Sequence, residues 1–295
     1  MIKNLYFICG PTATGKSSFA LKLAKKIGGV IINADSMQVY KNLEILTARP
    51  TKDDLKKIPH YLYGYIDGAE RYNVAKWCKD ILIIINKNKT KKIPSIIVGG
   101  SGMYIQTLLE GLIELPEISE SYKKKSEKIL NDIGLNKFIE LINKFDSNSL
   151  KEINVNDTMR LKRIWEIYYS TGITFSEWKK KQNKKFLKNF SYEIYLFIPP
   201  RNAIYEKVDN RFVKMIDNGA IEEVKKLLLL NLDKSLPIMK AHGVPEISDY
   251  LNNKSSIQNC ISKGQQVTRN YVKRQLTWWR SSNLKIDKIF DDFSD

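Results

Sequence analysis

The residues best suited to do chemistry lie near the start of the chain, in a glycine-rich segment from Gly10 to Ser17. The segment reads Gly-Pro-Thr-Ala-Thr-Gly-Lys-Ser, which is the Gly-x-x-x-x-Gly-Lys-Ser spacing of a phosphate-binding loop. Backbone N–H groups in such a loop point inward at an anion, and the helix that follows adds its partial positive charge. We expect Lys16 to contact the outer phosphate oxygens and the Ser17 hydroxyl to ligate Mg²⁺. The loop alone does not show which phosphate compound it binds.

A carboxylate follows the second predicted strand. Residues 30–33 form a short apolar run typical of a buried parallel strand, and Asp35 comes soon after it. Because the carboxyl ends of the strands in an open parallel sheet share one crevice, we expect Asp35 to lie beside the phosphate loop. A carboxylate there can accept a proton as a general base or can ligate Mg²⁺, and the residues themselves leave both roles open.

The elements that must position these residues are those of an α/β protein. Apolar runs predict parallel strands at 5–9, 30–33, 93–98 and 192–198. The third of these strands runs into a second glycine-rich segment, Gly-Gly-Ser-Gly-Met-Tyr, at 99–104. We therefore expect a P-loop-containing parallel sheet flanked by helices.

The middle of the chain changes character and predicts a mostly helical insertion domain. The clearest helix begins at Asp157, which can cap it, and ends at Gly172, with Leu161, Ile164, Trp165 and Tyr168 on one apolar face. Two further helices are expected after the last strand, one that holds Ile204 to Met215 and ends near Gly219 and one from Ile221 to Leu230. We expect residues 1–115 and 190–295 to form the catalytic core with C-terminal helices, and 116–189 to form the insertion.

Composition limits the class of protein. A chain of 295 residues with 43% hydrophobic content can bury a full core, and no apolar run approaches the length of a membrane span. The chain runs from Met1 straight into its first strand, so we expect a cytoplasmic monomer with no signal peptide and no membrane partner. Cys9, Cys78 and Cys260 form no CxxC pair, so neither a disulfide framework nor a zinc finger is expected.

The net charge of +17 favours a polyanionic partner, because each phosphate that a protein neutralises releases counterions. The alternative is a lysine-rich composition whose side chains are merely solvated. A predicted helix at 265–280 favours a nucleic acid. Its apolar face is predicted to hold Val267, Tyr271 and Trp278, and its opposite, basic face Arg269, Lys273 and Arg280. The alternative for this helix is an ordinary amphipathic surface helix.

With these pieces placed, the chain resembles the tRNA dimethylallyltransferases, also called tRNA isopentenyltransferases, of the bacterial type. The resemblance rests on five motifs in the family's order, at Gly10–Ser17, Asp35–Tyr40, Gly99–Tyr104, Asn156–Arg163 and Lys273–Arg280. The first is generic to phosphate loops, whereas Asp-Ser-Met-Gln-Val-Tyr and Lys-Arg-Gln-Leu-Thr-Trp-Trp-Arg are specific.

Four positions depart from the family pattern. Leu46 stands where the family usually has Gly, Tyr61 replaces the second residue of a His-His pair, and Ser101 replaces a threonine but keeps its hydroxyl. The segment from His242 to Glu246 differs from the usual Ile-Gly-Tyr-x-Glu, which leaves its role open.

The resemblance implies transfer of a dimethylallyl group from dimethylallyl diphosphate to the exocyclic N6 amine of the adenosine adjacent (3′) to the anticodon, giving N6-(dimethylallyl)adenosine. It implies Asp35 as the general base, Mg²⁺ as the cofactor with Ser17 as its ligand, and the tRNA anticodon stem-loop as the partner. The implied catalytic residues are Asp35, Lys16, Ser17, Ser101 and Arg211. The implied diphosphate-binding residues are Gly10, Pro11, Thr12, Ala13, Thr14, Gly15, Lys16 and Ser17. The implied tRNA-binding residues are Asp35, Ser36, Met37, Gln38, Ser101, Lys123, Met159, Arg160, Leu161, Lys162, Arg163, Lys273, Arg274, Gln275 and Arg280.

Three other functions use the same phosphate loop. A small-molecule P-loop kinase would use Lys16, Ser17 and Asp35 to pass a phosphoryl group to a hydroxyl, and a binding or regulatory NTPase would need less. The strand at 96–98 ends in glycines rather than a second carboxylate, which leans away from ATP hydrolysis. Prenylation of free adenine nucleotides is the third, and it would leave the basic helices without a purpose.

Overall fold

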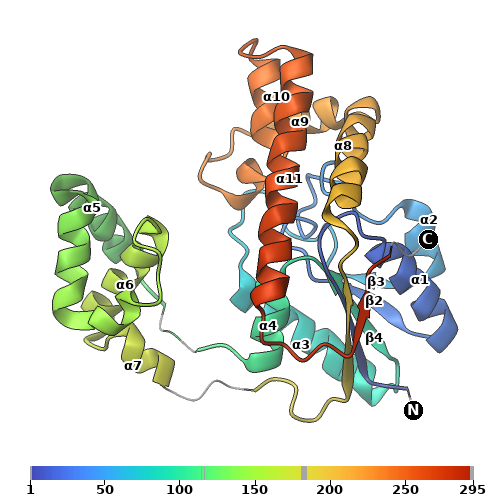
Figure 1. Cartoon of the computed structure of the whole chain (residues 1–295), viewed down its shortest axis with the longest axis horizontal. Helices are drawn as coiled ribbons and strands as arrows, with labels where there is room; N and C mark the ends of the chain where they lie inside the picture. The colour runs from blue at the N-terminus through green and yellow to red at the C-terminus, as the bar shows by residue number, and fades with distance from the viewer. Residues whose placement is uncertain (1, 114, 116, 181–184, 293–295) are drawn as a thin grey trace. The chain divides into compact units, whose positions relative to one another are not determined.

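The computed structural model describes residues 2–113, 115, 117–180 and 185–292, and the chain divides into two units (Figure 1). The core unit comprises Met1–Leu109 and Leu187–Asp295, and the helical unit comprises Glu110–Phe186. The expected boundary at 189 lies close to this division, and the one at 116 falls on a residue outside the described ones. Among the described helices, none is long and apolar enough to cross a membrane.

The core unit is built on a six-stranded sheet with the strand order β3-β2-β4-β1-β5-β6. Every pairing between these strands is parallel, which confirms the predicted sheet. The strands are β1 (Leu5–Cys9), β2 (Val30–Asn33), β3 (His60–Tyr61), β4 (Ser95–Gly99), β5 (Tyr192–Phe197) and β6 (Lys288–Phe290). The two edge strands, β3 and β6, were not predicted, because so few residues carry no readable pattern.

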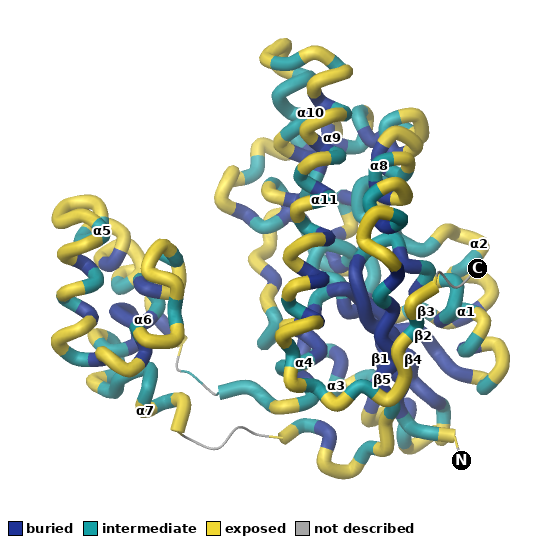
Figure 2. The backbone as a smooth tube through the Cα atoms, viewed as in Figure 1, coloured by how far each residue is buried: buried dark blue, intermediate teal, exposed yellow. Residues whose placement is uncertain are grey.

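Helices cover the sheet, so its inner strands read as continuous apolar runs (Figure 2). Every residue of β1, β2 and β4 is buried. Helix α1 (Lys16–Ile27) packs Ala20 and Ala24 into the cluster that contains Ile8, Ile31 and Ile96. The other helices of this half are α2 (Lys52–Lys57), α3 (Val74–Thr90) and α4 (Gly102–Glu110).

The C-terminal helices of the core unit stand beside one another above the sheet's carboxyl edge (Figure 1). They are α8 (Arg201–Asp217), α9 (Ala220–Leu228), the 3₁₀ turn η1 (Pro237–Lys240), α10 (Val244–Leu251) and α11 (Ile257–Ser281). Ile204 and Val208 of α8 pack against Val272 and Leu276 of α11. This contact fixes the long basic helix beside α8.

The buried face of α11 differs from the predicted one by a rotation about the helix axis. Its buried face is formed by Thr268, Val272, Gln275, Leu276 and Trp279 instead of Val267, Tyr271 and Trp278, which are only partly buried. Gln275 and Thr268 face inward although they are polar, so a count of apolar residues alone placed the helix incorrectly. Arg269, on the predicted basic face, is engaged within the core unit, because its guanidinium forms an ion pair with Asp209 of α8 at 2.6 Å.

The helical unit has its own apolar core. It contains α5 (Glu120–Leu150), whose helical geometry is interrupted at Gly134 and Asp146, α6 (Thr158–Thr171) and α7 (Phe175–Lys180). The expected start and end of α6 are confirmed: the Asp157 side chain accepts a hydrogen bond from the Arg160 N–H, and Gly172 caps the other end. The core residues are Phe138, Ile142, Leu161, Ile164 and Trp165.

Candidate active site

The phosphate loop leaves β1 through a position that only glycine can occupy. Gly10 has a φ of 132°, and a Cβ placed on it would lie 2.2 Å from the carbonyl oxygen of Phe197 in β5. The loop therefore turns sharply at the sheet's edge and enters α1 at Gly15. Residues Thr12 to Ser18 line a cavity of about 220 Å³ at this point.

Lys16 lies inside the loop, with its ammonium group turned onto the loop's own backbone. Its Nζ donates hydrogen bonds to the Pro11 carbonyl oxygen and, at 3.4 Å, to Thr14 Oγ1. The residue is buried, and burial lowers the pKa of Lys16 to about 8, while the negative charge of Asp35 opposes this shift. Lys16 is therefore mostly protonated at neutral pH, but it loses its proton when the pH rises only slightly above neutral.

Arg211 of α8 reaches the loop from the other side. Its guanidinium donates a hydrogen bond to Thr12 Oγ1 at 2.8 Å. Burial lowers the pKa of Arg211 and Asp35 again opposes the shift, so two cations and one carboxylate share this small volume. Because both cations line the cavity at the loop, an anion bound in it would lie close to Lys16 and Arg211.

Gln275 of α11 ties the two glycine-rich loops together. Its Oε1 accepts a hydrogen bond from the Thr12 N–H at 3.0 Å, and its Nε2 donates one to the Gly100 carbonyl oxygen at 3.0 Å. A Cβ on Gly100 would lie 2.2 Å from Gln275 Nε2, so a side chain there would displace the Gln275 amide. The Gln275 amide, expected to contact tRNA, is thus buried and bound to both loops, and its contact with tRNA stays a prediction.

Asp35 is held in a fixed turn after β2. The buried Asn33 amide bridges this turn: Asn33 Oδ1 accepts from the Asp35 N–H at 2.8 Å, and Asn33 Nδ2 donates to the Asp35 carbonyl oxygen at 2.9 Å. Asp35 Oδ1 accepts from the N–H groups of Met37 and Gln38 at 2.8 and 3.3 Å. Within the described part of the chain, Asp35 Oδ2 has no hydrogen-bond partner, so one oxygen is available to a substrate.

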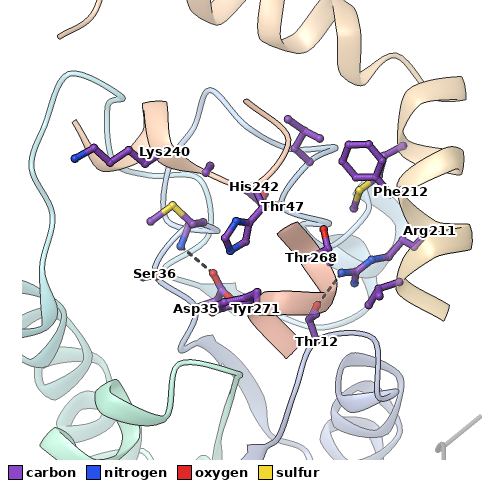
Figure 3. Close-up of a pocket in the computed structure, with 15 residues that line it drawn as sticks. Thr12, Asp35, Ser36, Thr47, Arg211, Phe212, Lys240, His242, Thr268 and Tyr271 are labelled. Atoms are coloured by element: carbon purple, nitrogen blue, oxygen red, sulfur yellow. Dashed lines mark hydrogen bonds between the residues drawn. The ribbon is translucent and has the colours of Figure 1, made fainter. Parts of the chain in front are cut away.

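The Asp35 carboxylate lies where two cavities adjoin, and Figure 3 shows the residues that line one of them. The cavity around the phosphate loop and a second one of about 220 Å³ share Thr12, Asp35, Thr47 and Arg211. The predicted proximity of Asp35 and the loop is thus confirmed, although β4 lies between their strands. One wall of the second cavity is apolar and is formed by Leu46, Val208, Phe212 and Met215.

Aromatic groups complete the site next to Asp35. Tyr271 and His242 line the same cavity, with their ring centroids 4.7 Å apart. Burial raises the pKa of Tyr271, and the charge of Asp35 adds to the effect, so the phenol stays neutral. Burial also lowers the pKa of His242, and Arg274 adds to that shift, so the imidazole is neutral near pH 7. Neither residue was predicted from the sequence to line the site.

Several residues expected to bind tRNA are exposed. Lys273, Arg274 and Arg280 project from α11, and the side chains of Arg160 and Arg163 on α6 are 66% and 40% exposed. Met159 is also exposed, as is Lys123, whose ammonium pairs with Glu120 at 2.5 Å.

Two other residues expected to bind tRNA have engaged side chains. Leu161 is fully buried in the helical unit's core, and its expected contact with tRNA stays a prediction. Lys162 is mostly buried, and its ammonium forms an ion pair with Glu127.

Near the phosphate loop, the Ser101 hydroxyl accepts a hydrogen bond from the Ser36 N–H at 3.4 Å. This bond joins the second glycine-rich loop to the Asp35 turn.

Comparison with known proteins agrees with this architecture. The family model described as IPP transferase matches residues 38–282. The tRNA dimethylallyltransferase of Ehrlichia canis is 40% identical over 95% of this chain and 92% of its own, and that of Pelagibacter ubique is 41% identical over 97% and 92%. The chain belongs to the IPP transferase family. As a member of this family, it is a transferase.

Solved structures of IPP transferases share the fold. A eukaryotic dimethylallyltransferase acting on tRNA matches with a TM-score of 0.80 and 28% identity, covering 94% of this chain and 70% of that one. The tRNA isopentenylpyrophosphate transferase of Bacillus halodurans matches with a TM-score of 0.69 and 27% identity, covering 99% and 90%. Family membership decides against the kinase and the regulatory NTPase that the phosphate loop alone left open.

The residues of this IPP transferase suit a magnesium ion that is bound jointly by the protein and the substrate, rather than one bound by protein side chains alone. The Ser17 side chain and Asp35 line the same cavity, and hydroxyl and carboxylate oxygens are ligands that Mg²⁺ prefers. The described residues contain no group of three or more His, Cys, Asp or Glu side chains that could hold a metal. Phosphate oxygens of the substrate would therefore have to complete the coordination, as is common for Mg²⁺.

Proposed function

We propose that this IPP transferase moves a dimethylallyl group from dimethylallyl diphosphate to the exocyclic N6 amine of the adenosine 3′ to the anticodon of tRNA. The observation that carries the proposal is the meeting, at Asp35, of a cationic phosphate cavity and a cavity with an apolar wall. These two environments match the diphosphate and the hydrocarbon ends of an allylic diphosphate. The tRNA dimethylallyltransferases of Ehrlichia canis and Pelagibacter ubique support this choice of substrates.

The phosphate loop stabilises the leaving group. As the bond between the allylic carbon and oxygen breaks, negative charge develops on the diphosphate, and the loop N–H groups, Lys16 and Arg211 are placed to receive it. Held by Ser17, by the diphosphate and by Asp35 if it is a ligand, Mg²⁺ would supply further charge stabilisation. Before the substrate binds, Lys16 is held within the loop by its hydrogen bonds to Pro11 and Thr14, and Arg211 is held beside the loop by its bond to Thr12.

Asp35 prepares the nucleophile. An aryl amine is a weak nucleophile, so its N–H must be oriented and its proton must be accepted as the new bond between N6 and the allylic carbon forms. Asp35 Oδ2 takes this proton, and diphosphate leaves with the electrons of the broken C–O bond. The turn around Asn33 holds the carboxylate still while Oδ1 remains bound to the backbone.

Two groups of exposed cations bind the tRNA. The first is on α11 and comprises Lys273, Arg274 and Arg280, and the second is on α6 and comprises Arg160 and Arg163. The target adenosine must leave its stack to reach Asp35, at a cost of a few kcal/mol, and phosphate contacts made by these cations offset that cost.

Replacing a phosphate-binding cation is expected to change how tRNA affinity depends on salt. Arg163→Ala and Lys273→Ala should each weaken binding and should each flatten the slope of log K against log salt by about one. Fluorescence anisotropy with an anticodon stem-loop at several salt concentrations measures both quantities. Lys226→Ala removes an exposed cation from α9, outside both groups, and should leave the slope as it is. Unchanged slopes in both test variants would mean that neither side chain meets a phosphate.

Transfer of label tests the proposed function. The purified protein is incubated with labelled dimethylallyl diphosphate and Mg²⁺, in one tube with unmodified tRNA and in another with AMP. We expect label in tRNA alone and its loss when Mg²⁺ is chelated. Label in AMP at a similar rate would favour prenylation of free nucleotides, and label in neither would contradict the proposal.

A further inference from the structure

The apolar wall beside Asp35 has a fixed side formed by Phe212. A Cβ on Gly264 would lie 2.1 Å from Phe212 Cζ, and one on Gly243 would lie 3.2 Å from Phe212 Cε2. The ring therefore lies directly against the backbone of α11 and of the turn that begins α10. Because protein interiors are close-packed, it has no space to retreat from a longer ligand. Figure 3 shows Phe212 across the cavity from Asp35.

Leu46 forms the adjacent part of this wall. It lines the cavity with Phe212, and a Cβ on Gly243 would lie 2.8 Å from Leu46 Cδ2. Both side chains thus meet the same glycine backbone. Leu46 lies in the connection between β2 and α2, on a different part of the chain from Phe212, so the wall exists only where these segments meet.

Glu223 of α9 keeps the Leu46 turn in place. Its Oε1 accepts hydrogen bonds from the N–H groups of Glu44 and Ile45 at 2.5 and 2.8 Å, and its Oε2 accepts one from the Leu46 N–H at 3.0 Å. Hydrogen bonds to a charged carboxylate are stronger than those between neutral groups. The backbone that carries Leu46 is therefore anchored to a helix, and the side chain cannot leave the wall by a simple loop movement.

We propose that Leu46, together with Phe212, sets the length of the allylic chain that the site accepts. Dimethylallyl diphosphate fits between the phosphate loop and this wall, whereas geranyl diphosphate, which is longer by one isoprene unit, meets Leu46 and Phe212. The inference rests on the proposed function, since it assumes that the diphosphate lies on the phosphate loop. It makes Leu46 a specificity-determining residue for the same transfer reaction.

Rates of label transfer to tRNA from the two diphosphates test this inference. For the wild type, kcat/KM with geranyl diphosphate should be at least about 100-fold below that with dimethylallyl diphosphate. Leu46→Ala should narrow this ratio by about 10- to 200-fold, by raising geranyl transfer and weakening the fit of the shorter chain. Leu229→Ala makes the same truncation at a side chain that is 73% exposed, and it should keep the wild-type ratio.

The outcomes of these transfer assays separate this inference from the proposed function. A wild type that uses both diphosphates equally, or a folded Leu46→Ala variant with an unchanged ratio, would overturn the inference while leaving the transferase proposal intact. A wild type that labels tRNA from neither diphosphate would overturn the proposed function and this inference with it. If Leu46→Ala fails to fold, Leu46→Val removes a single carbon and should shift the ratio in the same direction.

Discussion

Replacing Asp35 with Asn is expected to lower the rate of dimethylallyl transfer by about 10²- to 10⁴-fold while leaving tRNA affinity nearly unchanged. The amide keeps an oxygen that can accept the hydrogen bonds of Met37 and Gln38, so the turn should persist. What is lost is the negative charge of Oδ2, which the chemical step needs and tRNA binding does not. Single-turnover labelling with saturating tRNA measures the step, and anisotropy measures the affinity.

The Asp35→Asn variant also separates the two roles that the sequence left open for this carboxylate. If Asp35 ligates Mg²⁺, the variant should need more Mg²⁺ for half-maximal rate, and a high concentration should restore much of its activity. If Asp35 is the base alone, the rate should stay low at every Mg²⁺ concentration. A near-normal single-turnover rate, with an unchanged Mg²⁺ concentration for half-maximal rate, would mean that Asp35 has neither role.

The second large effect is expected at Lys16, where Lys16→Ala should lower kcat/KM for dimethylallyl diphosphate by about 10²- to 10³-fold. The pKa of about 8 also predicts a pH dependence. The protonated ammonium binds the diphosphate, and it loses its proton as pH rises through the pKa. In the wild type, kcat/KM should therefore be level below about pH 8 and should fall about tenfold per pH unit above it.

Two variants show whether Lys16 is the group that titrates. In Lys16→Arg the guanidinium stays charged, so the alkaline fall should disappear from the measured range whatever the absolute rate. Lys22→Ala removes an exposed lysine from the same helix and should keep the wild-type profile. If Lys16→Ala retained the same fall above pH 8, another group would be responsible for it.

The sequence was informative wherever chemistry follows from local spacing or from the rules of parallel sheets. The turn at Gly10 and the entry into α1 are set by residues that are neighbours in the chain, so the motif alone predicted them. Asp35 is distant in sequence from the loop, but the carboxyl ends of parallel strands meet at one edge, and this rule brought the two together.

The rest of the site depends on contacts between distant segments. Gln275 faces the phosphate loop because α11 packs on α8, and its partner Thr12 lies 263 residues away. The turn that carries Leu46 is held by Glu223, 177 residues further along the chain. Contacts between segments this far apart leave no periodic pattern in the sequence. The buried face of α11 was therefore predicted wrongly, and the apolar wall was not predicted.

The most direct test of the account is to find the atom that receives the label. Two transcripts of one tRNA are compared, one with adenosine and one with guanosine 3′ to the anticodon, and each is digested to nucleosides after reaction with labelled dimethylallyl diphosphate. We expect label only in the adenosine transcript, recovered as N6-(dimethylallyl)adenosine. Equal labelling of the two transcripts, or label on any other nucleoside, would contradict it.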